Sequence, residues 1–182
     1  MPLIHDVPKA FSDRECDWIV ALGERAGLAP ATVWAGAGDT VDRAVRSALT
    51  SHHPRSAATA WIYDRLDRLF EEAGIAFGIP VGEIAEPLQV LRYEEGGHFR
   101  AWHSDAGYDA TDRRLVSVSV ELSDPGDHEG GLLEIIPDTV DRPRTLERGG
   151  ARFFPSRAIH RVTPVTRGVR HALVIWTGGP AA

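Results

Sequence analysis

The spacing of apolar residues in the first 80 positions predicts two amphipathic helices. Ser12 and Glu15 have the spacing of a capping box, in which each side chain accepts a hydrogen bond from the other residue's backbone N–H. Apolar residues follow, and Gly27 is expected to end this first helix. A second helix is predicted after Pro54, because apolar residues then recur at three- and four-residue steps. The stripe that these residues would bury consists of Ala58, Trp61, Ile62, Leu66, Leu69, Phe70 and Ala73.

The segment between these helices, residues 34–53, is rich in Gly, Ser and Thr and has weak periodicity. This composition predicts a loop with one edge strand at most.

From residue 87 onward the pattern changes to short β-type runs separated by Gly, Pro and Asp. About seven strands are predicted, at 88–93, 99–103, 115–122, 132–136, 152–154, 159–162 and 170–176. Their spacing is typical of an antiparallel sandwich or barrel, with the helices packed on the outside of the sheets.

The run 115–120 alternates between Leu or Val and Ser. Successive side chains in a strand point to opposite faces, so the valines share one face and Ser117 and Ser119 share the other. A face with small hydroxyl groups indicates the lining of a cavity rather than a dry core.

Composition bounds the class of protein. The chain has 182 residues, of which 43% are hydrophobic, which predicts one globular domain and excludes disorder as the main state. The single cysteine, Cys16, cannot form an internal disulfide, and no apolar run is long enough for a membrane helix, so we expect a cytoplasmic protein without a membrane partner. A net charge of −6 argues against nucleic acid as the main partner.

His103 and Asp105 are the first candidates for metal ligands. In an extended chain, residues two apart send their side chains to the same side, which suits two ligands on one ion. The tripeptide alone is a weak signal, because such tripeptides arise often by chance and a surface pair is the default interpretation. His160, which lies in an apolar strand after an aromatic-Pro turn, is the best third ligand. Two histidines and one carboxylate leave coordination positions open, as in non-haem Fe(II) oxygenases.

Arg170 is the candidate for binding an anion. A hairpin centred on Val165 would pair His160 with Arg170 and keep both side chains on one face. A buried guanidinium needs a carboxylate partner. That partner is either Glu121, on the cavity-facing side of its own strand, or the carboxylate of a ligand.

With these residues identified, the sequence resembles the Fe(II)- and 2-oxoglutarate-dependent oxygenases, in particular the prolyl-4-hydroxylase-like group with its bacterial PKHD-type hydroxylases. The matching stretches are residues 93–105, 129–133, 154–162 and 168–170. The resemblance implies a double-stranded β-helix, also called a jelly-roll barrel. A single domain is therefore predicted over 1–182, with a helical lead-in and loop at 1–86 and the barrel core at 87–180.

The resemblance implies that His103, Asp105 and His160 bind Fe(II) and that Arg170 binds the distal carboxylate of 2-oxoglutarate. Tyr93 would line this pocket and Trp176 would be the aromatic residue on the last strand. Two positions depart from the family pattern: Arg100 stands where many relatives have an aromatic residue, and Glu121 where some have a tyrosine. A hydroxyl of Tyr93, Ser117 or Ser119 would then assist Arg170.

The implied reaction converts O2 and 2-oxoglutarate into CO2 and succinate while an unactivated C–H bond is hydroxylated. Stimulation by ascorbate is a further hypothesis. The substrate is either a prolyl or other residue of a peptide or protein, or a free amino acid or small metabolite, and the sequence does not separate these. A non-catalytic metal-binding barrel that acts as a sensor or binding module is the alternative from another class.

Residues expected to border the barrel mouth are the candidates for binding substrate. They are Arg43, Arg46, Arg100, Trp102 and Tyr108. Because three of them are arginines in an otherwise acidic protein, we hypothesise that the substrate carries a carboxylate or an acidic flank.

Overall fold

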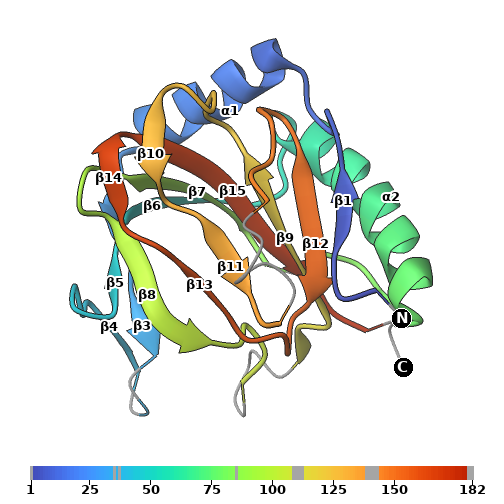
Figure 1. Cartoon of the computed structure of the whole chain (residues 1–182). Coiled ribbons are helices and arrows are strands. Elements are labelled where there is room, and N and C mark those ends of the chain that lie inside the picture. Colours follow the sequence, from blue (N-terminus) through green and yellow to red (C-terminus); the bar gives the residue numbers. More distant parts are fainter. Residues whose placement is uncertain are drawn as a thin grey trace.

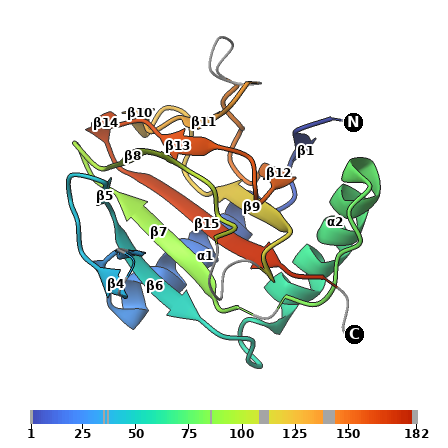
Figure 2. The same cartoon turned by 90° about the horizontal axis from the view of Figure 1, so that it is seen from below.

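Two β-sheets face each other in this computed structural model, and helices cover the outer face of one of them (Figure 1). The structure describes residues 2–34, 36, 38–84, 86–107, 113–137 and 144–179. Figure 2 shows the smaller sheet above the larger sheet, with helix α1 (Asp13–Ala26) behind the strands of the larger sheet and α2 (Ala60–Phe77) along its right-hand side. In the described part of the chain, no helix is long and apolar enough to cross a membrane.

The larger sheet, called here the major sheet, has seven strands and forms the framework of the molecule. In spatial order they are β1 (His5–Val7), β12 (Ala151–Pro155), β9 (Val116–Glu121), β15 (Arg170–Thr177), β7 (Leu88–Tyr93), β6 (Leu49–His53) and β2 (Ala29–Pro30). All neighbouring pairs are antiparallel.

The smaller sheet, called the minor sheet, has four antiparallel strands: β11 (Leu133–Ile135), β13 (His160–Val162), β8 (His98–His103) and β5 (Arg46–Ser47). Two short strand pairs complete the described architecture. They are β10 (His128–Gly130) with β14 (Val165–Gly168), and β3 (Val33–Trp34) with β4 (Asp39–Thr40).

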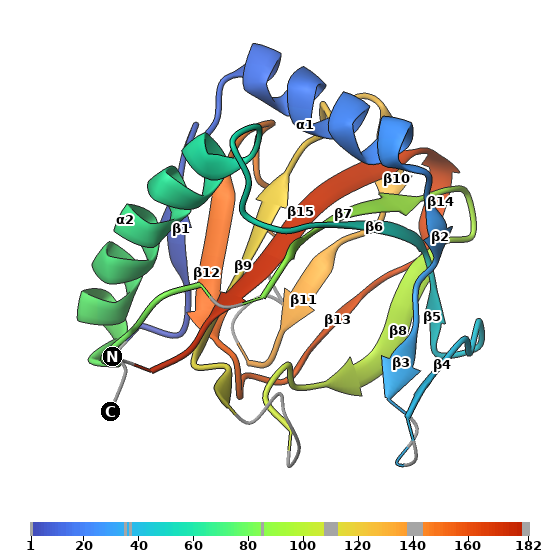
Figure 3. The same cartoon turned by 180° about the vertical axis from the view of Figure 1, so that it is seen from behind.

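Both helices form as their sequence patterns predict. Ser12 and Glu15 make the reciprocal capping-box hydrogen bonds at the start of α1, and the chain leaves that helix at Gly27. Helix α2 begins after Thr59 and ends at Gly78, whose left-handed φ of 65° suits a residue without a side chain. Figure 3 shows α1 along the top of the major sheet and α2 along its left side, and the helices contact β6, β7, β9 and β12 of that sheet.

The helix stripe and the valines of β9 together form the main core. Ile62, Leu66 and Phe70 of α2 are at most 1% exposed, and Phe70 packs edge-on against Phe153 of β12, with ring centroids 5.2 Å apart. Val116, Val118 and Val120 join the same cluster. The valine face of β9 is therefore the core face, and the serine face is left for the space between the sheets.

The prediction of a loop over residues 34–53 is wrong. This segment contains β4, β5 and β6, and it begins within β3. Strand β6 pairs with β7 in the major sheet, and β5 pairs with β8 in the minor sheet. These strands are held by hydrogen bonds to the edges of the sheets, which require no apolar alternation of their own. The N-terminal lead-in thus supplies strands to both sheets.

The predicted hairpin between His160 and Arg170 is also wrong. Strand β14, which contains the supposed turn residue Val165, pairs with β10, while β15 pairs with β7 and β9. His160 and Arg170 therefore belong to facing sheets. Both side chains are nevertheless buried, at 5% and 4% exposed.

Candidate active site

Three potential metal ligands converge between the two sheets. His103 ends β8, Asp105 lies in the bend that follows, and His160 begins β13, directly opposite His103 in the strand register. The Nε2 atoms of His103 and His160 lie 3.9 and 3.6 Å from the carboxylate oxygens of Asp105. One ligand atom from each residue lies within 4.8 Å of the others, a spacing that fits one metal ion.

The backbone fixes which nitrogen each imidazole presents. The Nδ1 atom of His103 lies 2.9 Å from the carbonyl oxygen of Ala101, and that of His160 lies 2.9 Å from the carbonyl oxygen of Ala158. A carbonyl can only accept, so Nδ1 carries the proton in both rings. The Nε2 lone pairs then face Asp105, as metal-binding histidines require.

Asp105 is held by a serine bracket, defined here as Ser117 and Ser156. The Ser117 hydroxyl donates to a carboxylate oxygen of Asp105 over 2.7 Å and lies 2.9 Å from the Ser156 hydroxyl. The Asp105 amide donates to the carbonyl of Ser156 over 2.9 Å. Burial by itself raises the pKa of Asp105, but the two neighbouring histidines and the Ser117 hydroxyl outweigh burial and hold that pKa below its ordinary value.

The pKa values of the two imidazoles are shifted in opposite directions. Burial lowers the pKa of His103 to about 4, and the nearby His160 adds to this effect, so His103 is neutral at pH 7. Burial also acts to lower the pKa of His160, but the Asp105 carboxylate prevails and raises it. A neutral imidazole is the form that binds metal, so metal binding at His160 competes with protonation.

Two aromatic rings pack against the histidines of this His-Asp-His cluster. The Phe99 ring stacks on His103 at 3.7 Å between centroids, and Phe154 meets His160 edge-on at 4.8 Å. In the register of β8 with β13, Phe99 pairs with Val162 and His103 pairs with His160. Phe99 and His103 are four residues apart, but Val162 and His160 are only two apart, so β8 contains a bulge between these pairs. The bulge brings the Phe99 ring onto the His103 ring. The sequence interpretation missed Phe99 and Ser156. Every second residue of a strand faces the same side, so counting back from His103 could have placed Phe99 on the face of the metal ligands. No local sequence signal marks Ser156.

This donor set fits Fe(II). Two imidazole nitrogens and one carboxylate oxygen are the ligands typical of non-haem Fe(II) oxygenases. The shell that orients all three ligands is already formed by backbone carbonyls and the serine bracket.

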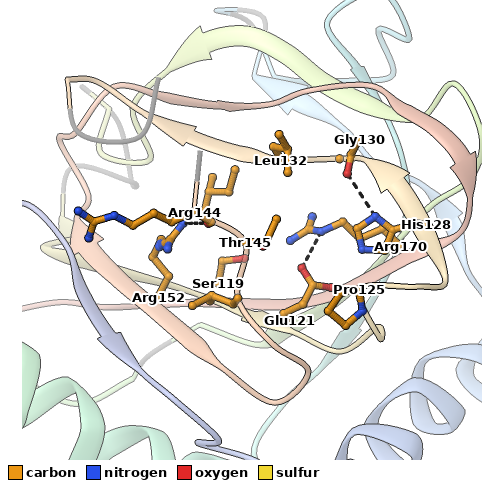
Figure 4. Close-up of a pocket in the computed structure, with 13 residues that line it drawn as sticks. Ser119, Glu121, Pro125, His128, Gly130, Leu132, Arg144, Thr145, Arg152 and Arg170 are labelled. Carbon is orange, nitrogen blue, oxygen red and sulfur yellow. Dashed lines mark hydrogen bonds and ion pairs between the residues drawn. The ribbon is translucent and has the colours of Figure 1, made fainter. Parts of the chain in front are cut away.

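A pocket of about 120 Å³ lies between the sheets (Figure 4), and Ser119, which lines it, is two residues from Ser117 on the same face of β9. Arg170, Glu121 and Ser119 of the major sheet line it, together with residues of the β10–β11 segment. Its volume gives room for one small organic molecule. Ser119 and Glu121 belong to the serine face of β9, so the prediction that this face lines a cavity is confirmed.

Arg170 is paired with Glu121 inside this pocket. Its Nε donates to a Glu121 carboxylate oxygen over 2.9 Å, and the side chains are only 5% and 11% exposed. Of the residues that the structure describes, none hydrogen-bonds to the two terminal nitrogens of Arg170. The internal partner that the sequence offered for Arg170 thus exists, and two donor groups remain for a ligand.

The other residues predicted for the cosubstrate site share the inward face of the major sheet. Tyr93 is the register partner of Arg170, and its ring lies 5.6 Å from the guanidinium. Trp176 lies on the same face of β15, six residues on, under the guanidinium of Arg114 at 3.7 Å. Ser117, in contrast, contacts Asp105.

Arg152 closes the opposite end of the pocket. Its guanidinium binds both carboxylate oxygens of Asp6 at 2.8 Å and donates to the carbonyl of Arg144. Because its charge and three of its donor groups are already engaged, Arg170 remains the better site for a further anion.

The structure separates the residues predicted for the barrel mouth. Arg100 and Trp102 alternate with the inward-facing residues of β8, so they lie on the outer face of the minor sheet. Arg100 is exposed and contacts His98, and Trp102 packs under Arg161. Arg43 and Arg46 lie together in a different hollow, and Tyr108 lies outside the described residues. Arg100 is thus not among the residues that line the hollow containing Arg43 and Arg46, and a role for these arginines in binding substrate stays a prediction.

Comparison with known proteins supplies the family. The sequence pattern of the 2OG-Fe(II) oxygenase superfamily matches residues 88–178, which is half of the chain and includes all three candidate ligands and Arg170. The chain belongs to this superfamily. Related sequences include PKHD-type hydroxylases of Hyphomonas neptunium (41% identity over 47% of this chain and 40% of that protein) and Sphingopyxis alaskensis (38% identity over 58% and 49%). The chain thus spans about half the length of these curated relatives, or less.

Solved structures confirm the fold of this oxygenase chain. A prolyl-4-hydroxylase of Pseudomonas putida aligns with a TM-score of 0.76 at 19% identity, over 98% of this chain and 94% of that protein. A prolyl hydroxylase of Trichoplax adhaerens, solved with a hypoxia inducible factor peptide fragment, aligns with a TM-score of 0.74 at 18% identity, over 97% and 83%. The predicted double-stranded β-helix with external helices is therefore confirmed.

Proposed function

We propose that this protein is an Fe(II)- and 2-oxoglutarate-dependent hydroxylase. His103, Asp105 and His160 would hold the iron, and Arg170 would hold the distal carboxylate of 2-oxoglutarate. The observation that carries the proposal is the convergence of an oriented His-Asp-His cluster with a small pocket whose buried arginine has free donor groups. Bound Fe(II) would supply the oxidation, in which O2 and 2-oxoglutarate become CO2 and succinate while one oxygen atom enters a C–H bond.

The protein's own groups would prepare this chemistry. Ser117 keeps one oxygen of Asp105 engaged, so the other oxygen is directed at the metal. Phe99 and Phe154 exclude water from the side of the two imidazoles. Tyr93, Ser119 and Trp176 would complete the cosubstrate pocket around Arg170.

Glu121 has a positioning role in this proposal. It binds Arg170 through Nε, which directs the terminal nitrogens into the pocket. A guanidinium held in this way presents two parallel N–H donors, the geometry that suits a carboxylate. This arrangement reconciles the ion pair with cosubstrate binding, since Arg170 has five donors and Glu121 occupies one.

A prolyl or other residue of a peptide is one candidate substrate class, supported by the peptide fragment bound to the Trichoplax adhaerens structure of the same fold. A free amino acid or small metabolite is the other. The competing function is a non-catalytic metal-binding barrel.

The test is a turnover assay with Fe(II), O2 and 2-oxoglutarate on prolyl peptides and free amino acids. Succinate release and a substrate mass gain of one oxygen are expected. Each should fall to background with a chelator and in the His160→Ala variant, used as the matched control. Metal and 2-oxoglutarate binding without succinate above the level of that variant would favour the sensor function. Ascorbate is added in a parallel arm.

A further inference from the structure

A second hollow, of about 220 Å³, lies beside the minor sheet and is lined by three arginines. We call it the arginine hollow and define it by Arg43, Arg46 and Arg92. Arg46 belongs to β5 and Arg92 to β7, while Arg43 lies in the segment between β4 and β5. The carboxylates on its rim are Glu94 and Glu95. In Figure 3, β3, β4 and β5 stand together at the end of the minor sheet where β8 begins.

The three arginines differ in how their charges are balanced. Arg92 is paired with Glu24 at 3.3 Å and with Glu94 at 3.1 Å. Within the described ranges, no carboxylate lies within ion-pair distance of Arg43 or Arg46. Among the described residues, the guanidinium groups of Arg43 and Arg46 therefore have no carboxylate as an ion-pair partner.

Arg46 also carries a donor group without a partner. One terminal nitrogen donates to the carbonyl of Thr32 over 3.0 Å, but its Nε is buried and finds no acceptor. The Nε of Arg92 is in the same condition. Because both Nε atoms are closed off from solvent, a ligand in the hollow would instead contact the terminal nitrogens of Arg46, of which only one is engaged within the described residues, by the Thr32 carbonyl.

The arginine hollow is connected to the candidate active site through one aromatic ring. Arg46 is the register partner of Phe99, and its guanidinium lies 5.1 Å from the centre of that ring. The same ring stacks on His103. One aromatic ring therefore separates Arg46 from His103, so a ligand held at Arg46 would lie close to the candidate metal ligands.

We propose that Arg46, assisted by Arg43, binds a carboxylate group of the substrate in the arginine hollow. This inference rests on the proposed hydroxylase function, because it names the substrate class of that same site. The carboxylate would be the α-carboxylate of a free amino acid or the side chain of Asp or Glu in a peptide. A fork of guanidinium donors matches either group. Arg100, on the outer face of the minor sheet, has no part in this site.

A binding experiment without turnover tests the site directly. N-acetylglycine carries a carboxylate, and N-acetylglycinamide is its neutral counterpart. Both are titrated into the metal-free protein, and the Arg92 Nε–H and Gly97 amide signals on the rim are followed by NMR. N-acetylglycine should shift these signals to saturation, and the amide should not.

Three variants locate the effect. Arg46→Gln should weaken this binding at least tenfold, and Arg46→Lys, which keeps the charge, should weaken it less. Arg167→Gln removes an exposed arginine paired with Glu129 and should leave it unchanged. A response that survives in Arg46→Gln but disappears in Arg170→Gln would place the carboxylate in the cosubstrate pocket and overturn the proposal.

Turnover with matched substrates then identifies the source of the carboxylate. Free amino acids are compared with their amides, and peptides with Glu are compared with the same peptides with Gln. The acid member of the preferred pair should have at least a tenfold higher kcat/KM, and Arg46→Gln should remove this preference by raising KM. Equal or better turnover of the neutral members would overturn the proposal. If no substrate is oxidised at all, the hydroxylase function fails, while the NMR titration still decides whether the hollow binds carboxylates.

Discussion

The major and minor sheets both contribute to the site, but they differ in what lies behind them. The major sheet has α1 and α2 on its outer face, and its core residues such as Val118 and Leu173 are at most 1% exposed. The minor sheet has exposed side chains on its outer face, including Trp102 at 39%. Yet the minor sheet carries both histidines of the candidate metal cluster.

This difference shows how the fold separates stability from chemistry. One face of the major sheet is committed to the core, and its opposite face offers Arg170 and Ser119 to the pocket. The minor sheet contributes less apolar packing, so its ligand geometry depends on hydrogen bonds and ring stacking around His103 and His160. Variants in the two regions should therefore have different consequences.

The largest effect is expected at the histidines of the minor sheet. His103→Ala or His160→Ala should abolish Fe(II) binding and 2-oxoglutarate turnover, because two ligands rarely retain the metal. The melting temperature of the metal-free protein should change little, since the main core lies behind the major sheet. Calorimetric metal titration and thermal melts measure both quantities. Normal turnover in either variant would contradict the ligand assignment.

The converse is expected for Phe70, on the helical side of the major sheet. Phe70→Ala removes a buried ring packed on Phe153 and should lower the free energy of unfolding by about 3–5 kcal/mol. Metal affinity of the folded fraction should be unchanged. Urea unfolding followed by metal titration at low temperature tests this, and a loss of metal affinity equal to that of His103→Ala would argue against the separation.

Arg170 tests whether the pocket face of the major sheet serves binding or structure. Arg170→Gln should weaken 2-oxoglutarate binding by about 2–5 kcal/mol and also reduce stability, because Glu121 is left buried without its partner. Glu121→Gln keeps an acceptor for Arg170 and removes a negative charge near the cosubstrate, so the KM for 2-oxoglutarate should not rise. If both variants lose stability with unchanged cosubstrate affinity, the pair is purely structural.

Ser117, on β9 of the major sheet, supports the candidate metal ligand Asp105, which follows β8 of the minor sheet. Ser117→Ala removes the hydroxyl that donates to Asp105 and should lower metal affinity about 10- to 100-fold. Ser119→Ala, two residues on along the same face, is the matched control and should retain metal affinity. Equal losses in both variants would indicate a general effect on β9.

The smallest effect is expected far from the site, at the start of α1. Arg65 binds Glu15 through two hydrogen bonds of 2.8 Å and lowers the pKa of Glu15 from an ordinary 4.5 to about 2. Glu15 therefore stabilises the fold above pH 4.5, and this contribution is lost as the pH falls toward 2. Because the pair is partly exposed, Glu15→Gln should cost about 1 kcal/mol at pH 7.

The control for Glu15 is an exposed pair of the same type. Glu129→Gln, which breaks the contact with Arg167, should leave stability nearly unchanged. Urea unfolding at pH 7 and pH 3 measures both variants. The difference between wild type and Glu15→Gln should shrink at the lower pH, and a difference independent of pH would exclude the ion pair as its cause.

The sequence by itself determined the features that depend on local periodicity. The capping box of Ser12, the buried stripe of α2 and the alternation of β9 each follow from the geometry of a single element. Each formed as predicted, except that Ala58 of the predicted stripe precedes α2 and is exposed, because the helix begins only after Thr59. The sequence also allowed His103, Asp105 and His160 to be chosen as candidate metal ligands, because few residue types can bind a metal ion.

Only the tertiary structure decided which strands became neighbours. Strands β5 and β6 form because β8 and β7 accept them as neighbours, and His160 and Arg170 lie in facing sheets instead of one hairpin. The bulge of β8 brings Phe99 onto His103 and, through Phe99, links Arg46 to the site. Pairing of this kind depends on hydrogen bonds between segments distant in sequence, and backbone groups are the same in every residue. Local side-chain patterns therefore carry little information about it.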